Sequence, residues 1–412
     1  MTPPIVDDGH KDLQDFRNLP RAPILSYLQK QAQPDAPRPK PAAPTLPYPL
    51  LAGFLPNRLF KWAFEYLRYR FAPRQPFPTY SATGSDNGVY ELQGDAGEIR
   101  IALAGDWASG TDEAAGVAKL ITAFDPHYAI HLGDVYYVGG PAEVDENFLG
   151  IRDPGRAYAP CLWPTGSRGS FALNGNHEMY ALGGIGYFRI MLPKLGLTVN
   201  GKPQGQGASF FYLHNEHWRI LAIDTGYNSV GWPIVERIFL PKCALPPQLL
   251  DWLRTTVKLD PKDPRGLILL SHHQYFSRYD DWYLKPAEQL AEFISRPVLW
   301  LWGHEHRMAI YEEFGVNGSI RAFGRCIGHG GLPIELPFPR ARHEQCRIEF
   351  TDEREYPNDE KLRIGFNGFA RLVLRGERLD IEYVDVCGDV AFTETWVARP
   401  GALARIAPTP RP

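Results

Sequence analysis

The 412-residue sequence predicts an α/β fold. After residue 98, short apolar runs alternate with helical patterns, and the runs "IRIALAGD" and "YAIHLGD" flank a helical stretch at 112–124. In the same way, "PPQLLDWLRTTVKL" leads to "LILLSHHQ" and "PAEQLAEFIS" leads to "RPVLWLWGHEH". Strands and helices that alternate along a chain are typical of a sheet covered by helices.

Three further segments predict antiparallel strand pairs. "ASFFYLHNEHWRILAID" turns at Asn215 and Glu216, "YEEFGVNGSIRAF" turns at Asn317 and Gly318, and "ARLVLRGERLDIEYVD" turns near Gly376. Alternating apolar residues on both sides of an Asn or Gly turn indicate a hairpin. We therefore expect antiparallel pairs beside the strands that helices connect.

Residues 1–98 differ from the rest in composition. The segment 33–49 is dense in proline and alanine, which predicts an extended, polyproline-like arm. The segment 57–71 has apolar residues at helical spacing and ends before Pro73, so it predicts an amphipathic helix. We expect this helix to dock on its own domain, and its basic residues leave contact with a membrane surface or a partner as the alternative. The expected division is an arm at 1–98, a folded domain at 99–398 and a tail at 399–412.

Charge and cysteine content limit the function classes. The net charge of -3 provides no field over the whole molecule that would attract nucleic acid or an anionic membrane. The N-terminal "MTPPIVDDGHKDLQDF" lacks the apolar region of a secretory signal, and no apolar run reaches transmembrane length. Five scattered cysteines predict reduced thiols and a cytoplasmic location. The oligomeric state is left open.

The main apolar runs end in residues that can bind a metal ion. These residues are Asp106, Asp134, Asn176, His272, and His304 together with His306. Ligands of open α/β sheets bind beyond the carboxyl ends of the strands, so residues distant in sequence can converge there. Any one of them alone is more often a helix cap, a turn residue or a core histidine. Together, with no competing set of thiols, they favour one site for zinc, manganese or iron.

These residues belong to five short blocks with a family resemblance. In order, "AGDWASG", "HLGDVYY", "NGNHE", "LLSHHQ" and "WGHEH" resemble the motif blocks of the calcineurin-like metallophosphoesterase superfamily. The first block usually carries a histidine two residues after its aspartate, where this chain has Ala108. The resemblance implies a two-sheet sandwich flanked by helices (αββα), to which the composition of the first residues adds an N-terminal arm.

The second block is similar to that of the purple acid phosphatase branch. That branch also lacks the first-block histidine, and the tyrosine of its G-D-x-x-Y motif binds a ferric ion. Gly133, Asp134 and Tyr137 have this spacing. The resemblance therefore implies that Tyr137 is a ligand, with hydrogen bonding or core packing as the alternative. Tyr136 is expected to point elsewhere and to pack.

The resemblance implies a binuclear centre. Metal one would be held by Asp106, Asp134, Tyr137 and His306, and metal two by Asp134, Asn176, His272 and His304. The expected cofactors are two ions, iron paired with iron, zinc or manganese. Such a centre hydrolyses phosphate esters through a metal-bound hydroxide.

Further polar residues have expected roles around this centre. His177 is expected to protonate the leaving group or bind phosphate, with orientation of Asn176 as the alternative. His273 is expected to contact substrate, and a shift of one residue would exchange the roles of His272 and His273. His329 in "GHGGLP" is a third candidate substrate contact. Asp224 is expected to be a cap or a supporting residue, and Glu305 to face away from the metals.

The leading hypothesis is a hydrolase of phosphoric esters, similar to an acid phosphatase, that acts on a small phosphoester and not on nucleic acid. One alternative is a Mn or Zn phosphodiesterase or nucleotidase on the same fold. The other alternative is a non-catalytic interaction scaffold. A scaffold is expected to have lost ligands, whereas only the position of Ala108 departs from the pattern here.

Overall fold

The computed structural model describes residues 74–84, 86–136, 138–151, 160–181, 183–230, 241–357 and 363–406. The expected proline-rich segment at 33–49, the expected helix at 57–71 and Tyr137 lie outside these residues, whereas most of 74–98 is described. Within the described ranges, no helix is long and apolar enough to cross a membrane. All five cysteines are free, as their spacing predicted.

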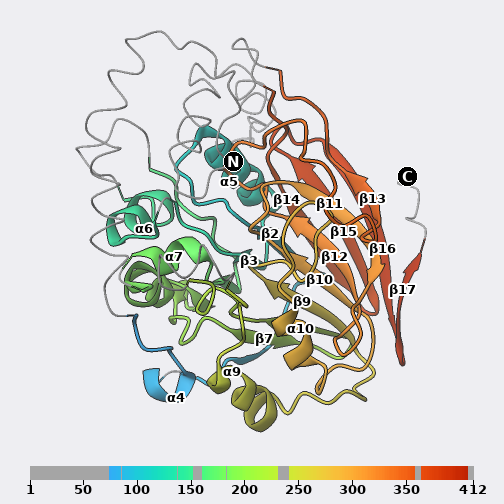
Figure 1. Ribbon diagram of the computed structural model, residues 1–412. Helices are drawn as coiled ribbons and strands as arrows, with labels where there is room; N and C mark the ends of the chain where they lie inside the picture. The colour runs from blue at the N-terminus through green and yellow to red at the C-terminus, as the bar shows by residue number, and fades with distance from the viewer. Residues whose placement is uncertain are drawn as a thin grey trace, which may run out of the picture.

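Two sheets form the body of the described chain (Figure 1). The eight-stranded sheet has the order β1 (Val89–Glu91), β7 (Phe211–His214), β8 (Trp218–Ala222), β9 (Gly266–Ser271), β10 (Val298–Trp302), β12 (Ala322–Ile327), β11 (Met308–Phe314) and β13 (Ile348–Thr351). The nine-stranded sheet has the order β17 (Ala402–Ile406), β16 (Val390–Arg399), β15 (Arg378–Asp385), β14 (Gly368–Arg375), β2 (Ile99–Ala104), β3 (Tyr128–His131), β4 (Gly169–Ala172), β5 (Gly196–Val199) and β6 (Lys202–Pro203). Both sheets are mixed, with parallel strands at their centres.

The predicted hairpins are confirmed. The pairs β7 with β8, β11 with β12 and β14 with β15 are all antiparallel. The sheets also extend beyond the expected domain bounds at 99–398, because β1 pairs with β7 and β17 pairs with β16. The folded unit thus includes residues on both sides of that range.

Helices cover the outer faces of both sheets. The predicted helix at 112–124 is α5 (Asp112–Phe124), whose N-cap Thr111 accepts a hydrogen bond from the backbone of Ala114. It packs with α6 (Pro141–Asn147) and two turns at Tyr187–Met191 and Leu192–Lys194 on the nine-stranded sheet. On the eight-stranded sheet lie α4 (Tyr80–Thr83), α9 (Pro247–Trp252) with the turn Leu253–Val257, and α10 (Leu284–Leu290).

The central core lies between the two sheets. Ile101 and Ile130 of one sheet pack in the same apolar cluster as Ile268 and Leu299 of the other. Strands apolar on both faces fit this arrangement, because each sheet is covered by the partner sheet on one side and by helices on the other. The expected αββα sandwich is confirmed, and it brings the strand ends of both sheets to one edge.

Candidate metal centre

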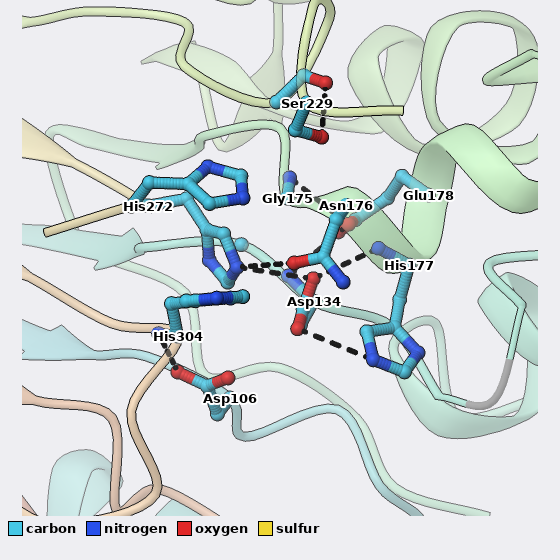
Figure 2. A network of polar contacts seen from close by, with 12 residues as sticks. Asp106, Asp134, Gly175, Asn176, His177, Glu178, Ser229, His272 and His304 are labelled. Carbon is cyan, nitrogen blue, oxygen red and sulfur yellow. Dashed lines mark hydrogen bonds and ion pairs between the residues drawn. The ribbon is translucent and has the colours of Figure 1, made fainter. Parts of the chain in front are cut away.

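Five of the predicted metal donors converge where strands of both sheets end: Asp106, Asp134, Asn176, His272 and His304 (Figure 2). Three follow strands of the nine-stranded sheet, and the histidines follow β9 and β10: Asp106 after β2, Asp134 after β3, Asn176 after β4, then His272, His304 and His306. Donor atoms of Asp106, Asp134 and His272 lie within 4.8 Å of one another, and so do those of His272, His273 and His304. Residues up to 198 positions apart therefore form one cluster, as the sequence predicted.

Three of these donors have left-handed backbone conformations. The φ angles are 58° at Asp106, 72° at Asp134 and 65° at His304. Such angles are uncommon outside glycine and cost on the order of 1 kcal/mol each, so they persist where the surrounding structure enforces them. At one of these turns, the backbone N–H of His304 donates to Oδ2 of Asp106 at 2.7 Å. The strained turns point the donors into the site.

A glycine makes room for the central carboxylate. A Cβ atom on Gly175 would lie 2.1 Å from Oδ1 of Asp134. That distance is far below van der Waals contact, so the glycine of the "GNHE" block allows the loop after β4 to approach Asp134.

His272 faces the amide and the carboxylate. Its Nε2 lies 3.1 Å from Oδ1 of Asn176 and 3.3 Å from Oδ1 of Asp134. Burial lowers the pKa of His272, but Asp134 outweighs burial and raises this pKa to about 9. A proton on Nε2 of His272 therefore faces the oxygens of Asn176 and Asp134. A metal cation would be stabilised by the same two oxygens.

Tyr136 points into the site, so the expectation that it packs elsewhere is wrong. Its Oη lies 2.7 Å from Oδ1 of Asp106, 2.9 Å from Nε2 of His306 and 3.3 Å from Oδ2 of Asp134. These three residues are the other predicted ligands of metal one. Tyr136 thus lies where a phenol ligand was expected from Tyr137.

The path of the chain explains this position. After the left-handed turn at Asp134, Val135 forms a parallel bridge with Ala108, and the backbone N–H of Tyr136 donates to the carbonyl of Ala108. Asn147 of α6 donates to the carbonyl of Tyr136 at 2.7 Å. This loop no longer has the simple alternation of a strand, so spacing from Asp134 alone does not determine which side chain turns inward.

His177 lies on the other side of Asp134 from His272 (Figure 2). Its backbone N–H donates to Oδ1 of Asp134 at 3.1 Å, and its Nε2 lies 3.7 Å from Oδ2. The ring centroid is 4.5 Å from that of Tyr136. The imidazole therefore adjoins the donor cluster without being a member of either group of converging ligand atoms.

The remaining predicted residues separate into two groups. Asp224 is a cap, because its Oδ1 accepts from the backbone N–H of Tyr227 at 2.7 Å, and Glu305 faces away, where its Oε2 accepts from Ser277 at 2.6 Å. Both expectations are confirmed. The buried His329 makes no hydrogen bond to a predicted ligand within the described chain, and its carbonyl accepts from Asn367.

Glu178 is a supporting residue that sequence reasoning did not single out. Its Oε2 accepts from the backbone N–H of Gly175 at 3.0 Å and from that of Asp134 at 3.2 Å. Burial raises the pKa of Glu178 to about 8. The available signal was its place three residues after Gly175, the N-cap of α7 (Asn176–Tyr180), where an acidic side chain commonly reaches back to the cap.

The site holds buried carboxyl groups without lysine or arginine partners. Asp106, Asp134 and Glu178 are at most 1% exposed, and no described lysine or arginine forms an ion pair with them. Burial opposes ionisation of Asp134, but His272 and His177 hold its pKa well below its usual range. Buried carboxylates in proteins are paired or bind metal ions, and these face only histidines, a phenol and an amide. The donor set therefore fits metal cations.

Comparison with known proteins agrees with this arrangement. Residues 99–308 match the family model of the calcineurin-like phosphoesterases, which is half of the chain. The chain belongs to the calcineurin-like phosphoesterase family. Membership supports a metal-dependent hydrolase of phosphoester bonds, and the matched segment contains all the metal donors described above.

The chain is also similar, at low sequence identity, to several solved structures. A purple acid phosphatase from yellow lupin seeds is 14% identical, with 74% of this chain and 54% of that one covered and a TM-score of 0.44. PhoD is 14% identical, with 82% and 73% covered and a TM-score of 0.46. A dimetal phosphatase from Danio rerio is 11% identical, with 72% and 98% covered and a TM-score of 0.38. No curated protein matches the chain.

Proposed function

We propose that this protein is a binuclear metal-dependent phosphoesterase of the purple acid phosphatase type. The observation that carries the proposal is the pair of buried carboxylates, Asp106 and Asp134, surrounded by histidine, amide and phenol donors and by no described lysine or arginine. Two cations bound there would neutralise the phosphoryl oxygens and lower the pKa of an attacking water.

Each metal would have four protein ligands, and Asp134 would belong to both sets. Asp106, Asp134, His306 and a tyrosine would hold metal one, and Asp134, Asn176, His272 and His304 would hold metal two. The contacts of Tyr136 support it as the tyrosine, while Tyr137 stays a prediction from motif spacing. A phenolate is a good ligand for ferric iron, so iron at metal one with iron, zinc or manganese at metal two is the proposed composition.

Other residues of the protein would hold the metal ligands in place and supply a proton. Glu178 accepts hydrogen bonds from the loops that carry Asp134 and Asn176, so the carboxylate of Asp134 and the amide oxygen of Asn176 keep their positions. His177 lies beside this group and can donate a proton to a departing alkoxide.

The decisive experiment combines metal analysis with hydrolysis assays. The purified protein is loaded with iron, zinc or manganese, and is then assayed with a chromogenic phosphomonoester and the matching diester. We expect two metal ions per chain and hydrolysis of at least one ester. In the Asp134→Asn variant, we expect loss of both the metal ions and the hydrolysis. A fully loaded protein that hydrolyses neither ester would support the scaffold alternative instead.

A further inference from the structure

Two adjacent histidines follow β9, and both lie among the candidate metal donors. His272 and His273 are both at most 2% exposed, and each ring approaches that of His304, with centroid distances of 5.2 Å and 4.5 Å. Proximity therefore does not distinguish them. The Nδ1 atoms of the two rings have different hydrogen-bond partners, and these partners distinguish the two histidines.

The partner of His272 is a carbonyl. Its Nδ1 lies 3.0 Å from the oxygen of Leu132. A carbonyl only accepts hydrogen bonds, so Nδ1 carries the proton, and Nε2 is left for the oxygens of Asn176 and Asp134 or for a metal ion. A backbone carbonyl on the far nitrogen is the usual support of a metal-binding histidine.

The partner of His273 is a hydroxyl. Oγ1 of Thr225 accepts from the backbone N–H of His273 at 3.0 Å and lies 3.1 Å from its Nδ1. Thr225 is 1% exposed, and these are the hydrogen bonds of its hydroxyl within the described chain. A buried hydroxyl proton without an acceptor is costly, so the arrangement that satisfies every group has Thr225 donating to Nδ1.

This arrangement places the proton of His273 on Nε2. A nitrogen that carries a proton donates hydrogen bonds and cannot bind a metal ion. Tyr283 holds the ring from another side, with its centroid 5.0 Å away at an interplanar angle of 70°. The imidazole is thus fixed at the edge of the metal-two donors, with a donor group available for an anion.

We propose that Thr225 is a positioning residue that holds His273 as its Nε2–H tautomer, so that His273 donates to a non-bridging oxygen of the bound phosphoryl group. The inference rests on the proposed phosphoesterase function. It assigns opposite tautomers to two neighbouring histidines: His272 binds metal, and His273 binds the substrate's phosphate.

The test measures the tautomer and phosphate affinity separately from turnover. Nuclear magnetic resonance of zinc-loaded protein with ¹⁵N-labelled histidine reports which nitrogen of His273 carries the proton, and we expect Nε2. Calorimetry with inorganic phosphate should show about tenfold weaker binding in Thr225→Val, because a hydrogen bond to a charged group is lost. Metal content should equal that of wild type, and Thr225→Ser should recover most of the affinity.

Two further variants complete the design. Thr198→Val removes a threonine hydroxyl that contacts Gly166, and it should bind phosphate like wild type. In His273→Ala, the added Thr225→Val change should weaken phosphate binding no further, because Thr225 acts through His273. A proton on Nδ1 of His273, or wild-type phosphate affinity in Thr225→Val, would overturn the inference. Absence of ester hydrolysis by wild type would instead overturn the proposed function, since neither readout here needs turnover.

Discussion

The phenol oxygen of Tyr136 lies 2.7 Å from Oδ1 of Asp106, although 30 residues separate them in the sequence. The contact joins the loop after β3 to the loop after β2, two residues before Ala108, where the first motif block lacks its usual histidine. Since His306 also lies 2.9 Å from the same oxygen, this phenol has the surroundings of a metal-one ligand.

The first prediction distinguishes the two adjacent tyrosines by colour. A phenolate bound to ferric iron absorbs visible light, so the oxidised, iron-loaded protein should be purple to pink. Tyr136→Phe should lose the absorption band and retain metal two, whereas Tyr137→Phe should keep the band. Visible spectra with metal analysis decide the matter. A band that is lost in Tyr137→Phe and kept in Tyr136→Phe would restore the motif-spacing assignment.

The second prediction concerns metal two. Asn176→Ala and His304→Ala each remove a proposed ligand, so each should lower turnover by orders of magnitude and leave about one metal ion per chain. Circular dichroism should show that the fold survives. Glu305→Gln is the matched control, because its side chain contacts Ser277 and not the site, and it should keep both metals. Full occupancy in both ligand variants would show that the site is misassigned.

The third prediction concerns His177 as a proton donor. A positioned general acid contributes about a hundredfold to ten-thousandfold, so His177→Ala should lose a comparable factor in kcat while retaining its metals. The loss should shrink along a series of phosphoesters whose leaving alcohols are increasingly acidic, because such alkoxides leave without protonation. An equal loss along the series would assign His177 to phosphate binding or to the support of Asn176.

The fourth prediction uses the buried cap at Asp224. Burial raises the pKa of this carboxyl to about 6, from a usual value of 3.8. Between these values the folded protein keeps a proton that the unfolded chain has lost. The associated stability is therefore full below about pH 4 and is lost as the pH rises through 6, a change of roughly 3 kcal/mol. Asp224→Asn cannot titrate, so the difference in unfolding free energy between wild type and variant should vary with pH by about this amount. Parallel stability curves for the two proteins would contradict the raised pKa.

The fifth prediction compares two ion pairs. Arg325 of β12 and Glu394 of β16 form a paired contact with both N···O distances at 2.7 Å, and both side chains are fully buried between the sheets. Glu394→Gln leaves the guanidinium unpaired and should cost about 3–5 kcal/mol of stability. Glu313→Gln disrupts the exposed pair with Arg321 and should cost less than about 1 kcal/mol. If both variants lose the same free energy of unfolding in denaturant titrations, burial does not determine how much each ion pair contributes to stability.

Much of the fold and of the donor set could be predicted from the sequence. The apolar runs and their connecting helices predicted the strands, and the ends of those runs identified Asp106, Asp134, Asn176 and the histidines as one cluster. This was feasible because strand periodicity is local, and because parallel strands place their carboxyl ends at one edge of a sheet.

Tertiary structure alone decided the direction of side chains in the turns after these strands. Asp134 has a left-handed backbone, and Val135 pairs with Ala108, so the next phenol turns toward Asp106 against the expectation from motif spacing. Periodicity ends where a strand ends, and the direction of each later side chain depends on contacts distant in sequence. For the same reason, the carbonyl of Leu132 and the hydroxyl of Thr225, each from a different strand end, distinguish two histidines that are equivalent in the sequence.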